Sequence, residues 1–175
     1  LHKEAGTETL IPLHGDMEHV VCLNCGYAED RRAFDARLAA ANPGYLERWV
    51  VRADEVNPDG DVALSQQAVD EFVMAPCIRC GSELLKPDVV YFGEPVPAER
   101  RDAARDLLAR SSSLIVVGSS LAVMSGYRFM LDALKQGKEV SVINGGPGRG
   151  DPKATTLWRA QVAPAFDELL DLLDV

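Results

Sequence analysis

Hydrophobic and polar positions alternate most informatively in the C-terminal half of the chain. Residues 113–118 and 139–144 are nearly continuous apolar runs rich in β-branched residues, a pattern typical of strands covered on both faces in a parallel sheet. Between them, residues 126–136 repeat apolar positions at helical spacing, and Gly137 suits the end of a helix. Strand, helix and strand in this order predict a βαβ unit.

Amphipathic periodicity predicts two more helices, at residues 97–110 and 164–173. We expect a buried strand within residues 84–95, where an apolar run ends in a loop rich in proline and glycine, and a short third strand at 160–162. The residues expected to face inward are Ala103, Leu107 and Leu108 in the first helix, and Phe166, Leu169, Leu170 and Leu173 in the second.

Shorter elements are predicted in the N-terminal half. Residues 20–22 indicate a strand, residues 31–41 a helix and residues 45–51 a second short helix. The composition of residues 57–61 favours a turn. Residues 68–74 fit either a strand or a helix, because the apolar positions do not separate the two.

The four cysteines of the chain form two C-x-x-C pairs, Cys22 with Cys25 and Cys77 with Cys80, and glycine follows each pair directly. Each such turn brings two thiolates to one ion, and two turns complete the tetrahedral sulfur shell that Zn²⁺ prefers. Since protein atoms fill all four positions, we expect a structural zinc and not a catalytic one. The alternatives are two disulfides in an oxidising compartment, a redox pair, which needs only one C-x-x-C, and unrelated free thiols.

Residues 26–76 separate the two pairs, whereas a zinc ribbon separates its pairs by only about 15–20 residues. A folded insert is therefore expected. The prediction is an α/β fold with a partial Rossmann-like parallel sheet, made of residues 1–19 and 84–175, and a small four-cysteine zinc-binding module with inserted helices, residues 20–83.

Composition restricts the possible partners. The chain of 175 residues, 47% of them hydrophobic, is long enough for one domain with a modest appendage. Its 18 basic and 27 acidic side chains give a formal charge of −9, which argues against direct nucleic-acid binding but would suit a cationic peptide. No apolar run approaches the length of a membrane span, and reduced thiols at a metal site suit a reducing compartment.

Polar groups follow both strands of the βαβ unit, where ligands of open α/β sheets bind. Gly118, Ser119 and Ser120 offer backbone N–H groups and hydroxyls that suit phosphate or ribose. Asn144 and Gly145 offer an amide beside an approachable backbone, which suits a sugar hydroxyl. Because no G-x-G-x-x-G motif is present, a plain turn with capping serines is the alternative.

Three side chains near the cysteine pairs are further candidates. His14 precedes Gly15 and the first pair, and an imidazole can remove a proton from a hydroxyl near neutral pH. A lone histidine is, however, more often structural. Glu94 taken alone is a surface carboxylate, and Phe92 fits either an apolar slot or ordinary core.

Five short motifs occur in an order that resembles the sirtuins, a family of NAD-dependent protein deacylases. The motifs are His14-Gly15, the paired C-x-x-C turns, residues 86–94, residues 118–123 and residues 142–144. The resemblance runs from residue 1 to about residue 173. Residues 118–129 are most similar to the class that includes the mitochondrial lipoamidase and ADP-ribosyltransferase sirtuin and its bacterial relatives.

The resemblance implies NAD-dependent removal of acyl groups from protein lysines, giving nicotinamide and O-acyl-ADP-ribose. It implies one structural Zn²⁺, NAD⁺ as cosubstrate, and an acyl-lysine protein or peptide as substrate. The alternatives are a mono-ADP-ribosyltransferase and a catalytically inactive zinc-containing binding fragment. A bacterial protein would be cytoplasmic and a eukaryotic one mitochondrial. The acyl group, the protein targets and the oligomeric state stay open.

The resemblance also assigns roles to residues. His14 would be the catalytic base that acts on a ribose hydroxyl after nicotinamide has left. The NAD⁺ site would comprise Gly118, Ser119, Ser120, Asn144, Gly145 and Val162; Val90 and Phe92 would line the acyl tunnel; Gly93, Glu94 and Val123 would flank the peptide; and Cys22, Cys25, Cys77 and Cys80 would bind zinc.

One large departure from the family pattern stands out. A sirtuin begins with a strand and a Gly-Ala-Gly-x-Ser phosphate loop, followed by a Gln-Asn-x-Asp strand, and none of these occurs in the chain. We expect the chain to correspond to roughly the C-terminal two-thirds of the family fold. Alone, it is expected to bind zinc, to have little or no deacylase activity, and to associate through an exposed apolar sheet edge.

Overall fold

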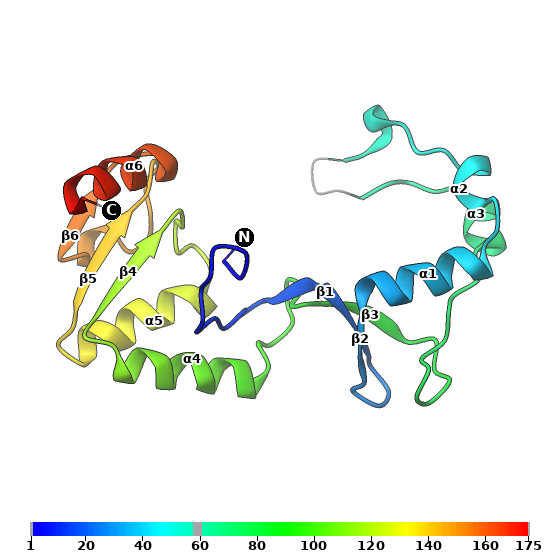
Figure 1. Ribbon diagram of the computed structural model, residues 1–175, viewed down its shortest axis with the longest axis horizontal. Coiled ribbons are helices and arrows are strands. Elements are labelled where there is room, and N and C mark those ends of the chain that lie inside the picture. Colours follow the sequence, from blue (N-terminus) through cyan, green and yellow to red (C-terminus); the bar gives the residue numbers. More distant parts are fainter. Residues whose placement is uncertain (1, 58–60, 175) are drawn as a thin grey trace. The chain divides into compact units, whose positions relative to one another are not determined.

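The computed structural model describes residues 2–57 and 61–174, which form two compact units. One unit comprises Leu1–Leu13 and Pro95–Val175, and the other comprises His14–Glu94. We call them the parallel-sheet unit and the cysteine unit, and describe each by itself (Figure 1).

The parallel-sheet unit contains a sheet of three parallel strands in the order β4-β5-β6 (Figure 1). The strands are β4 (Ser113–Val117), β5 (Glu139–Ile143) and β6 (Thr156–Trp158). Helix α5 (Met124–Lys135) connects β4 to β5. The predicted βαβ unit and the α/β fold with a parallel sheet are therefore confirmed.

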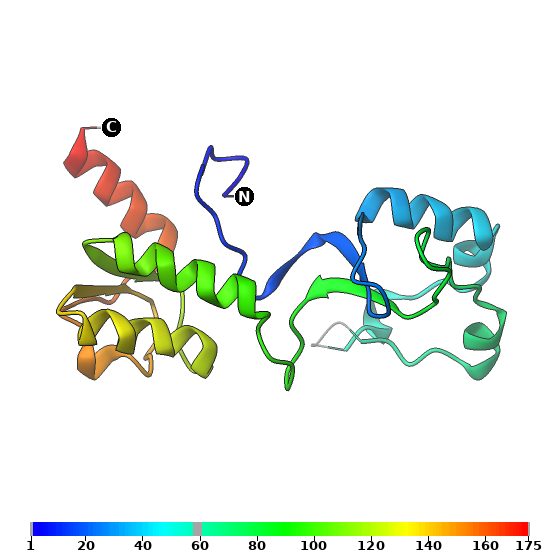
Figure 2. The same cartoon turned by 90° about the horizontal axis from the view of Figure 1, so that it is seen from below.

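Helices α4 (Ala98–Arg110) and α5 lie side by side against this sheet (Figures 1 and 2). Helix α5 ends in a Schellman motif, in which Gly137 has φ +71° and its N–H donates to the Leu134 carbonyl at 3.0 Å. The buried core between helices and sheet comprises Leu108, Val116, Leu121, Tyr127, Met130, Ala133, Val140 and Val142.

The other face of the sheet is open at β4. Ile115 is 61% exposed, and β4 is an edge strand, so the prediction that this strand is covered on both faces is wrong within the described residues. The apolar run was right about the strand but could not show what packs on it. The expected association through this surface stays a prediction.

Two helix faces also differ from the prediction. Helix α6 (Val162–Leu173) buries only Ala165 fully, whereas Phe166, Leu170 and Leu173 are exposed. In α4, Leu108 is buried and Leu107 half-buried, but Ala103 is exposed. Periodicity identifies an apolar face, but burial also needs a neighbouring element to cover it.

The third parallel strand lies earlier than predicted. Strand β6 pairs with β5 through Thr156, Leu157 and Trp158. Residues 160–162 are not a strand, because Val162 already begins α6. A 3-10 turn, η2 (Asp151–Lys153), precedes β6.

The cysteine unit is built on an antiparallel sheet in the order β2-β1-β3. Its strands are β1 (Gly15–Cys22), β2 (Ala28–Asp30) and β3 (Leu85–Val89). Strand β3 was predicted as a buried strand of the Rossmann-like portion; instead it is half-buried and pairs with β1. This pairing places the bounds of the compact unit at 14 and 94, whereas the functional division at 20 and 83 stays a prediction.

Three helices fill the region between the cysteine pairs. Helix α1 (Arg31–Ala41) matches its prediction, and α2 (Tyr45–Arg48) is shorter than predicted. Helix α3 (Gln66–Glu71) resolves the ambiguous segment as a helix, with residues 72–74 irregular. The unit also contains a 3-10 turn, η1 (Ala53–Glu55). The predicted turn at 57–61 includes residues 58–60, which lie outside the described residues.

A buried ion pair connects the helical insert to the second cysteine pair. Glu29 is 7% exposed, and its carboxylate accepts from Arg37 at 2.6 and 3.0 Å. Arg37 also donates to the Pro76 carbonyl at 2.8 Å, directly before Cys77. The small core beside it comprises Val20, Phe34 and Ala75. Breaking this pair would leave a buried charge uncompensated.

No helix within residues 2–57 and 61–174 is long and apolar enough to cross a lipid bilayer.

Candidate functional site

The two C-x-x-C turns have the same backbone hydrogen bonds. In each turn the N–H of the first cysteine donates to the carbonyl five residues later, and the following glycine donates back to the first cysteine, all at 2.8–2.9 Å. Gly26 and Gly81 have φ of +70° and +73°, a conformation that glycine adopts without strain. The local sequence therefore shapes two equivalent turns.

The four sulfurs converge on one point. The Sγ atoms of Cys22 and Cys80 lie 3.6 Å apart, those of Cys25 and Cys77 lie 3.7 Å apart, and all four ligand atoms lie within 4.8 Å of one another. A tetrahedral zinc with bonds of about 2.3 Å needs sulfurs about 3.8 Å apart. Cys22, Cys25, Cys77 and Cys80 therefore fit a zinc centre.

The protons of these thiols are strongly interdependent. The side chain of Asn24 donates to Cys80 and lowers the pKa of that thiol to about 6. At Cys25 the backbone N–H of Tyr27 favours the thiolate, but burial and the neighbouring sulfurs outweigh it and raise the pKa to about 12. Four clustered thiolates repel one another, and a divalent cation at their centre would stabilise all of them.

Backbone packing fixes the position of His14 and Gly15 beside β3. The His14 carbonyl accepts from the Val90 N–H at 2.8 Å. Gly15 has φ +88°, and a Cβ placed on it would lie 1.7 Å from the Asp88 carbonyl oxygen. Only glycine fits at this position, so the pairing of β1 with β3 requires the glycine of the His14-Gly15 motif.

Gly15→Ala is expected to destabilise the cysteine unit by about 2 kcal/mol more than Gly93→Ala does. The two glycines are matched in conformation, with φ of +88° and +89°, but a Cβ on Gly93 meets nothing within 4 Å. The backbone strain is shared, so the difference measures the clash with Asp88. Urea unfolding followed by Trp49 fluorescence tests this, and equal losses would exclude the clash.

An ion pair closes the loop after β3. Lys86 pairs with Glu94, donates to the Val89 carbonyl at 2.8 Å and lies 4.8 Å from the centroid of the Tyr91 ring. Its hydrogen bond to Glu94, assisted by the Tyr91 N–H, lowers the pKa of that carboxyl. Phe92 at the tip is 99% exposed, so the interpretation of Phe92 as core is wrong.

The candidate cofactor residues meet at the carboxyl ends of the parallel strands. Gly118 N–H donates to the Ile143 carbonyl at 2.9 Å, and Asn144 N–H donates to the Trp158 carbonyl at 3.2 Å. Gly118 has φ +64°, and a Cβ on it would lie 3.2 Å from Cγ2 of Val162. The glycine keeps open the space between β4 and the start of α6, where a ligand could approach the backbone.

The two serines do not cap α5. The Ser119 hydroxyl accepts from the Leu121 N–H at 3.2 Å and so shapes the turn, while Ser120 is exposed. Helix α5 begins after Val123, and no described side chain caps it. The serines therefore do not cap the helix, and the N–H groups at its start are open to a ligand. The binding role of the turn stays a prediction.

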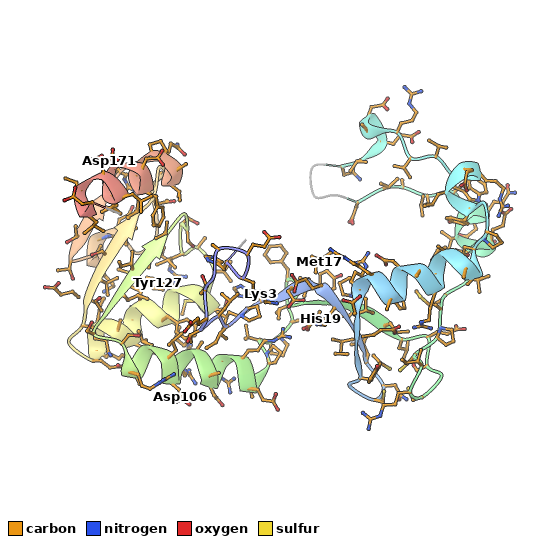
Figure 3. All side chains as sticks on the ribbon, viewed as in Figure 1. Lys3, Met17, His19, Asp106, Tyr127 and Asp171 are labelled. Atoms are coloured by element: carbon orange, nitrogen blue, oxygen red, sulfur yellow. The ribbon has the colours of Figure 1, made fainter. Side chains whose placement is uncertain are left out.

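Sequence reasoning missed Arg149, which holds the loop between β4 and α5. Its N–H donates to the Ser120 carbonyl at 2.7 Å, and its guanidinium donates to the Ala122 carbonyl at 3.2 Å. The guanidinium also lies 4.5 Å from the centroid of the Tyr127 ring. Tyr127 belongs to α5 (Figure 3). The available signal was an arginine alone in a loop of glycine and proline.

An ion pair beside Arg149 holds the loop that contains it. Asp151 pairs with Arg159 and accepts from the Gly148 N–H at 2.6 Å. The hydrogen bond from Arg159 lowers the pKa of Asp151. Arg159 also donates to the Gly146 carbonyl, so the loop after β5 is fastened at both ends.

Arg149→Ala is expected to speed amide hydrogen exchange at Leu121 and Tyr127 by about 10-fold, because one charged hydrogen bond and one cation–π contact disappear. Lys153→Ala, an exposed cation in the neighbouring turn η2, is the control and should leave exchange unchanged. Unchanged protection in Arg149→Ala would show that the loop is held by other contacts.

The predicted site residues thus fall into two sets. His14, Val90, Phe92, Gly93 and Glu94 lie around the end of β3 in the cysteine unit. The four cysteines belong to the same unit but lie near the start of β3, where Cys22 pairs with Leu85. The parallel-sheet unit contains Gly118, Ser119, Ser120, Val123, Asn144, Gly145 and Val162. Within each unit the residues are brought together, and the roles assigned to them stay predictions.

Comparison with known proteins supports the resemblance. A family model described as Sir2 family matches residues 1–125. The chain is 55% identical over all 175 residues to NAD-dependent protein deacetylase 1 of Corynebacterium efficiens. It is 40% identical over 174 residues, 99% of the chain, to the human NAD-dependent protein lipoamidase sirtuin-4, mitochondrial. It spans only 62% of the first relative and 52% of the second.

Solved structures show the same fold. A Sir2 complex with a p53 peptide and NAD⁺ superposes with a TM-score of 0.73 at 24% identity, covering 99% of this chain and 59% of that one. A Sir2 protein bound to a propionylated peptide gives 0.73 at 24% identity, covering 99% and 60%. At this identity the likeness concerns the fold alone.

Proposed function

The chain belongs to the Sir2 family, and on this premise we propose that it is the C-terminal part of an enzyme that removes acyl groups from protein lysines with NAD⁺ as cosubstrate. The observation that carries the proposal is the carboxyl edge of the parallel sheet, where Gly118, Asn144 and Val162 converge. It occurs in a chain 55% identical to a protein named as an NAD-dependent deacetylase. The products would be nicotinamide and O-acyl-ADP-ribose.

This edge would bind part of NAD⁺, namely phosphate, ribose and adenine groups. NAD⁺ would supply a ribose carbon that is electrophilic once nicotinamide departs. The backbone of Gly118 and the hydroxyls of Ser119 and Ser120 would bind phosphate and ribose. Asn144 and Gly145 would contact the second ribose, and Val162 would provide an apolar wall for adenine.

The cysteine unit would provide the base and much of the substrate site. His14 would accept the proton of a ribose hydroxyl, and its backbone bond to Val90 places the two residues side by side. Val90 and Phe92 would line the acyl tunnel, and the 99% exposure of Phe92 leaves that ring free to contact a substrate. Gly93, Glu94 and Val123 would flank the acyl-lysine peptide, added as a strand.

The zinc would have a structural role. The four sulfurs occupy a tetrahedral shell and leave no coordination position for water or substrate. One Zn²⁺ per chain would hold the two turns together and, through them, β1 and β3, since Cys22 pairs with Leu85.

We propose that the protein is located in the cytoplasm. The higher identity to the Corynebacterium protein than to the mitochondrial human one supports it.

Product analysis tests the function. The 175-residue chain and the same chain preceded by the N-terminal part of the family fold are each incubated with NAD⁺ and acetylated, propionylated or lipoylated lysine peptides, and the products are identified by mass spectrometry. From the extended chain we expect nicotinamide, O-acyl-ADP-ribose and free lysine in equal amounts, and no NAD⁺ consumption with the unacylated peptide. From the 175-residue chain alone we expect little or no turnover. ADP-ribose attached to a protein would indicate a mono-ADP-ribosyltransferase instead. No NAD⁺ consumption by the extended chain with any peptide would contradict both enzyme readings and favour a binding module.

A further inference from the structure

A pocket of about 330 Å³ lies between α4 and α5, within the parallel-sheet unit. Three arginines line it, Arg101 and Arg105 from α4 and Arg128 from α5. Among the described residues, no carboxylate lines this pocket, although the chain as a whole has a formal charge of −9. Its residues differ from those of the cofactor edge and from those of the zinc centre.

The charges of these arginines are only partly balanced. Asp102 pairs with Arg101 at 3.1 Å and with Arg105 at 3.6 Å, so one carboxylate serves two guanidiniums. In the described part of the chain, Arg128 has no hydrogen-bond or ion-pair partner. An adjoining hollow of about 210 Å³ shares Arg105 and Arg128 and adds Asp132 and Lys135, whose charges cancel. The pocket therefore keeps an excess of positive charge.

Like charges that face a common hollow repel one another, and an anion between them would remove this repulsion. Guanidinium groups are suited to this role, because their fixed donors match carboxylate and phosphate. The start of α5 adds to the effect, because no side chain caps it and its N–H groups carry partial positive charge. Arg128 lies just past the first turn of this helix.

Apart from Ser125, the rest of the pocket lining is apolar. It comprises Leu13, Pro95, Val96, Met124 and Phe129. A bare inorganic anion would leave these side chains in contact with water, whereas a ligand with an apolar body would cover them. Charge at one side and apolar surface at the other define an amphipathic small molecule as the occupant.

We propose that the pocket between α4 and α5 binds a small organic anion, with its carboxylate or phosphate against Arg105 and Arg128 and its apolar part against Met124 and Phe129. The site is separate from the proposed catalytic residues. It adjoins them in sequence, because Met124 directly follows Val123.

Titration calorimetry with four probes tests the proposal: benzoate, phenyl phosphate, inorganic phosphate and benzyl alcohol. We expect one or both of benzoate and phenyl phosphate to bind, and to bind at least 10-fold more tightly than inorganic phosphate or benzyl alcohol. The preferred probe identifies carboxylate or phosphate as the head group. Binding should weaken as sodium chloride is raised. Absence of binding by both aromatic anions would overturn the proposal.

Variants place the probe in the pocket. Arg105→Gln and Arg128→Gln should each weaken binding of the preferred probe by about 10-fold. Arg110→Gln, also on α4 but outside the pocket lining, is the matched control and should leave affinity unchanged. Asn144→Ala, at the cofactor edge, should also leave it unchanged. Circular dichroism confirms that each variant is folded. Equal affinity in the Arg105→Gln/Arg128→Gln double variant, or an equal loss in either control, would refute the site.

Discussion

Serine in place of Cys77 is expected to release the zinc and unfold the cysteine unit while the parallel-sheet unit stays folded. Structural zinc contributes about 10–16 kcal/mol in small zinc domains, as much as the whole stability of many proteins. The unit has little to replace it, since among its described residues the buried core cluster comprises Val20, Phe34 and Ala75. Loss of one ligand also removes the link between the turns that contain Cys22 and Cys80.

The two tryptophans make this measurable, because each unit contains one. Trp49 follows α2 in the cysteine unit, and Trp158 ends β6 in the parallel-sheet unit. In Trp158→Phe the fluorescence reports the cysteine unit, and in Trp49→Phe it reports the parallel sheet. Cys77→Ser should abolish the unfolding transition seen by Trp49 and leave that seen by Trp158 in place. In the protein with all four cysteines, a chelator should likewise abolish the transition seen by Trp49 and leave that seen by Trp158.

Elemental analysis supplies the stoichiometry, with one zinc per chain expected before chelation and a large loss in Cys77→Ser. A metal-free protein whose Trp49 transition is cooperative and insensitive to chelators would refute the metal centre. It would also remove the reason for the matched geometry of the two turns.

Local signals explain why part of the fold could be predicted from the sequence. The C-x-x-C-Gly pattern fixes a turn through its own hydrogen bonds, so Cys22 and Cys77 needed no tertiary information. The β-branched runs at β4 and β5 and the glycine at the end of α5 act locally in the same way. These were the elements whose positions agreed with the structure.

Predictions failed where the outcome depends on distant neighbours. Strand β3 (Leu85–Val89) was expected in the Rossmann-like portion, but it pairs with β1, which lies far earlier in the sequence. The local sequence of β3 does not show which strand will be its partner. Strand β6 has only three residues, too few for a pattern, and the sequence signal was instead placed at 160–162. Phe166 and Leu170 share the apolar face of α6, but no described element buries them.

The candidate site divides in the same way. Gly118 and Asn144 could be found because ligand groups of a parallel sheet follow the strand ends. Arg149 could not be found in this way, because it acts through hydrogen bonds to Ser120 and Ala122, which are far from it in sequence. The arginines of the α4–α5 pocket looked like ordinary solvent-facing charges, since a helix sequence does not reveal which cations share a hollow.

His14→Ala, made in the chain preceded by the N-terminal part of the family fold, is expected to lower kcat for deacylation by about 10²–10⁴-fold, the usual contribution of a general base. The side chain is exposed, and the backbone bond from Val90 to the His14 carbonyl does not require the imidazole, so the fold should survive. In the reaction proposed, nicotinamide leaves before the base acts. The variant should therefore still exchange labelled nicotinamide into NAD⁺ while failing to release O-acyl-ADP-ribose.

His19→Ala is the matched control. It removes the same side chain from the same unit, but His19 lies on β1 with its Nδ1 2.9 Å from an Asp16 carboxylate oxygen, and no role in the reaction is proposed for it. Its deacylation rate should stay within about 2-fold of that of the parent protein, because substitutions on the surface usually have small effects. A near-parental rate in His14→Ala would remove His14 from the role of base. A loss of exchange and deacylation together would instead assign His14 to binding, because a base that acts after nicotinamide departure cannot affect the exchange.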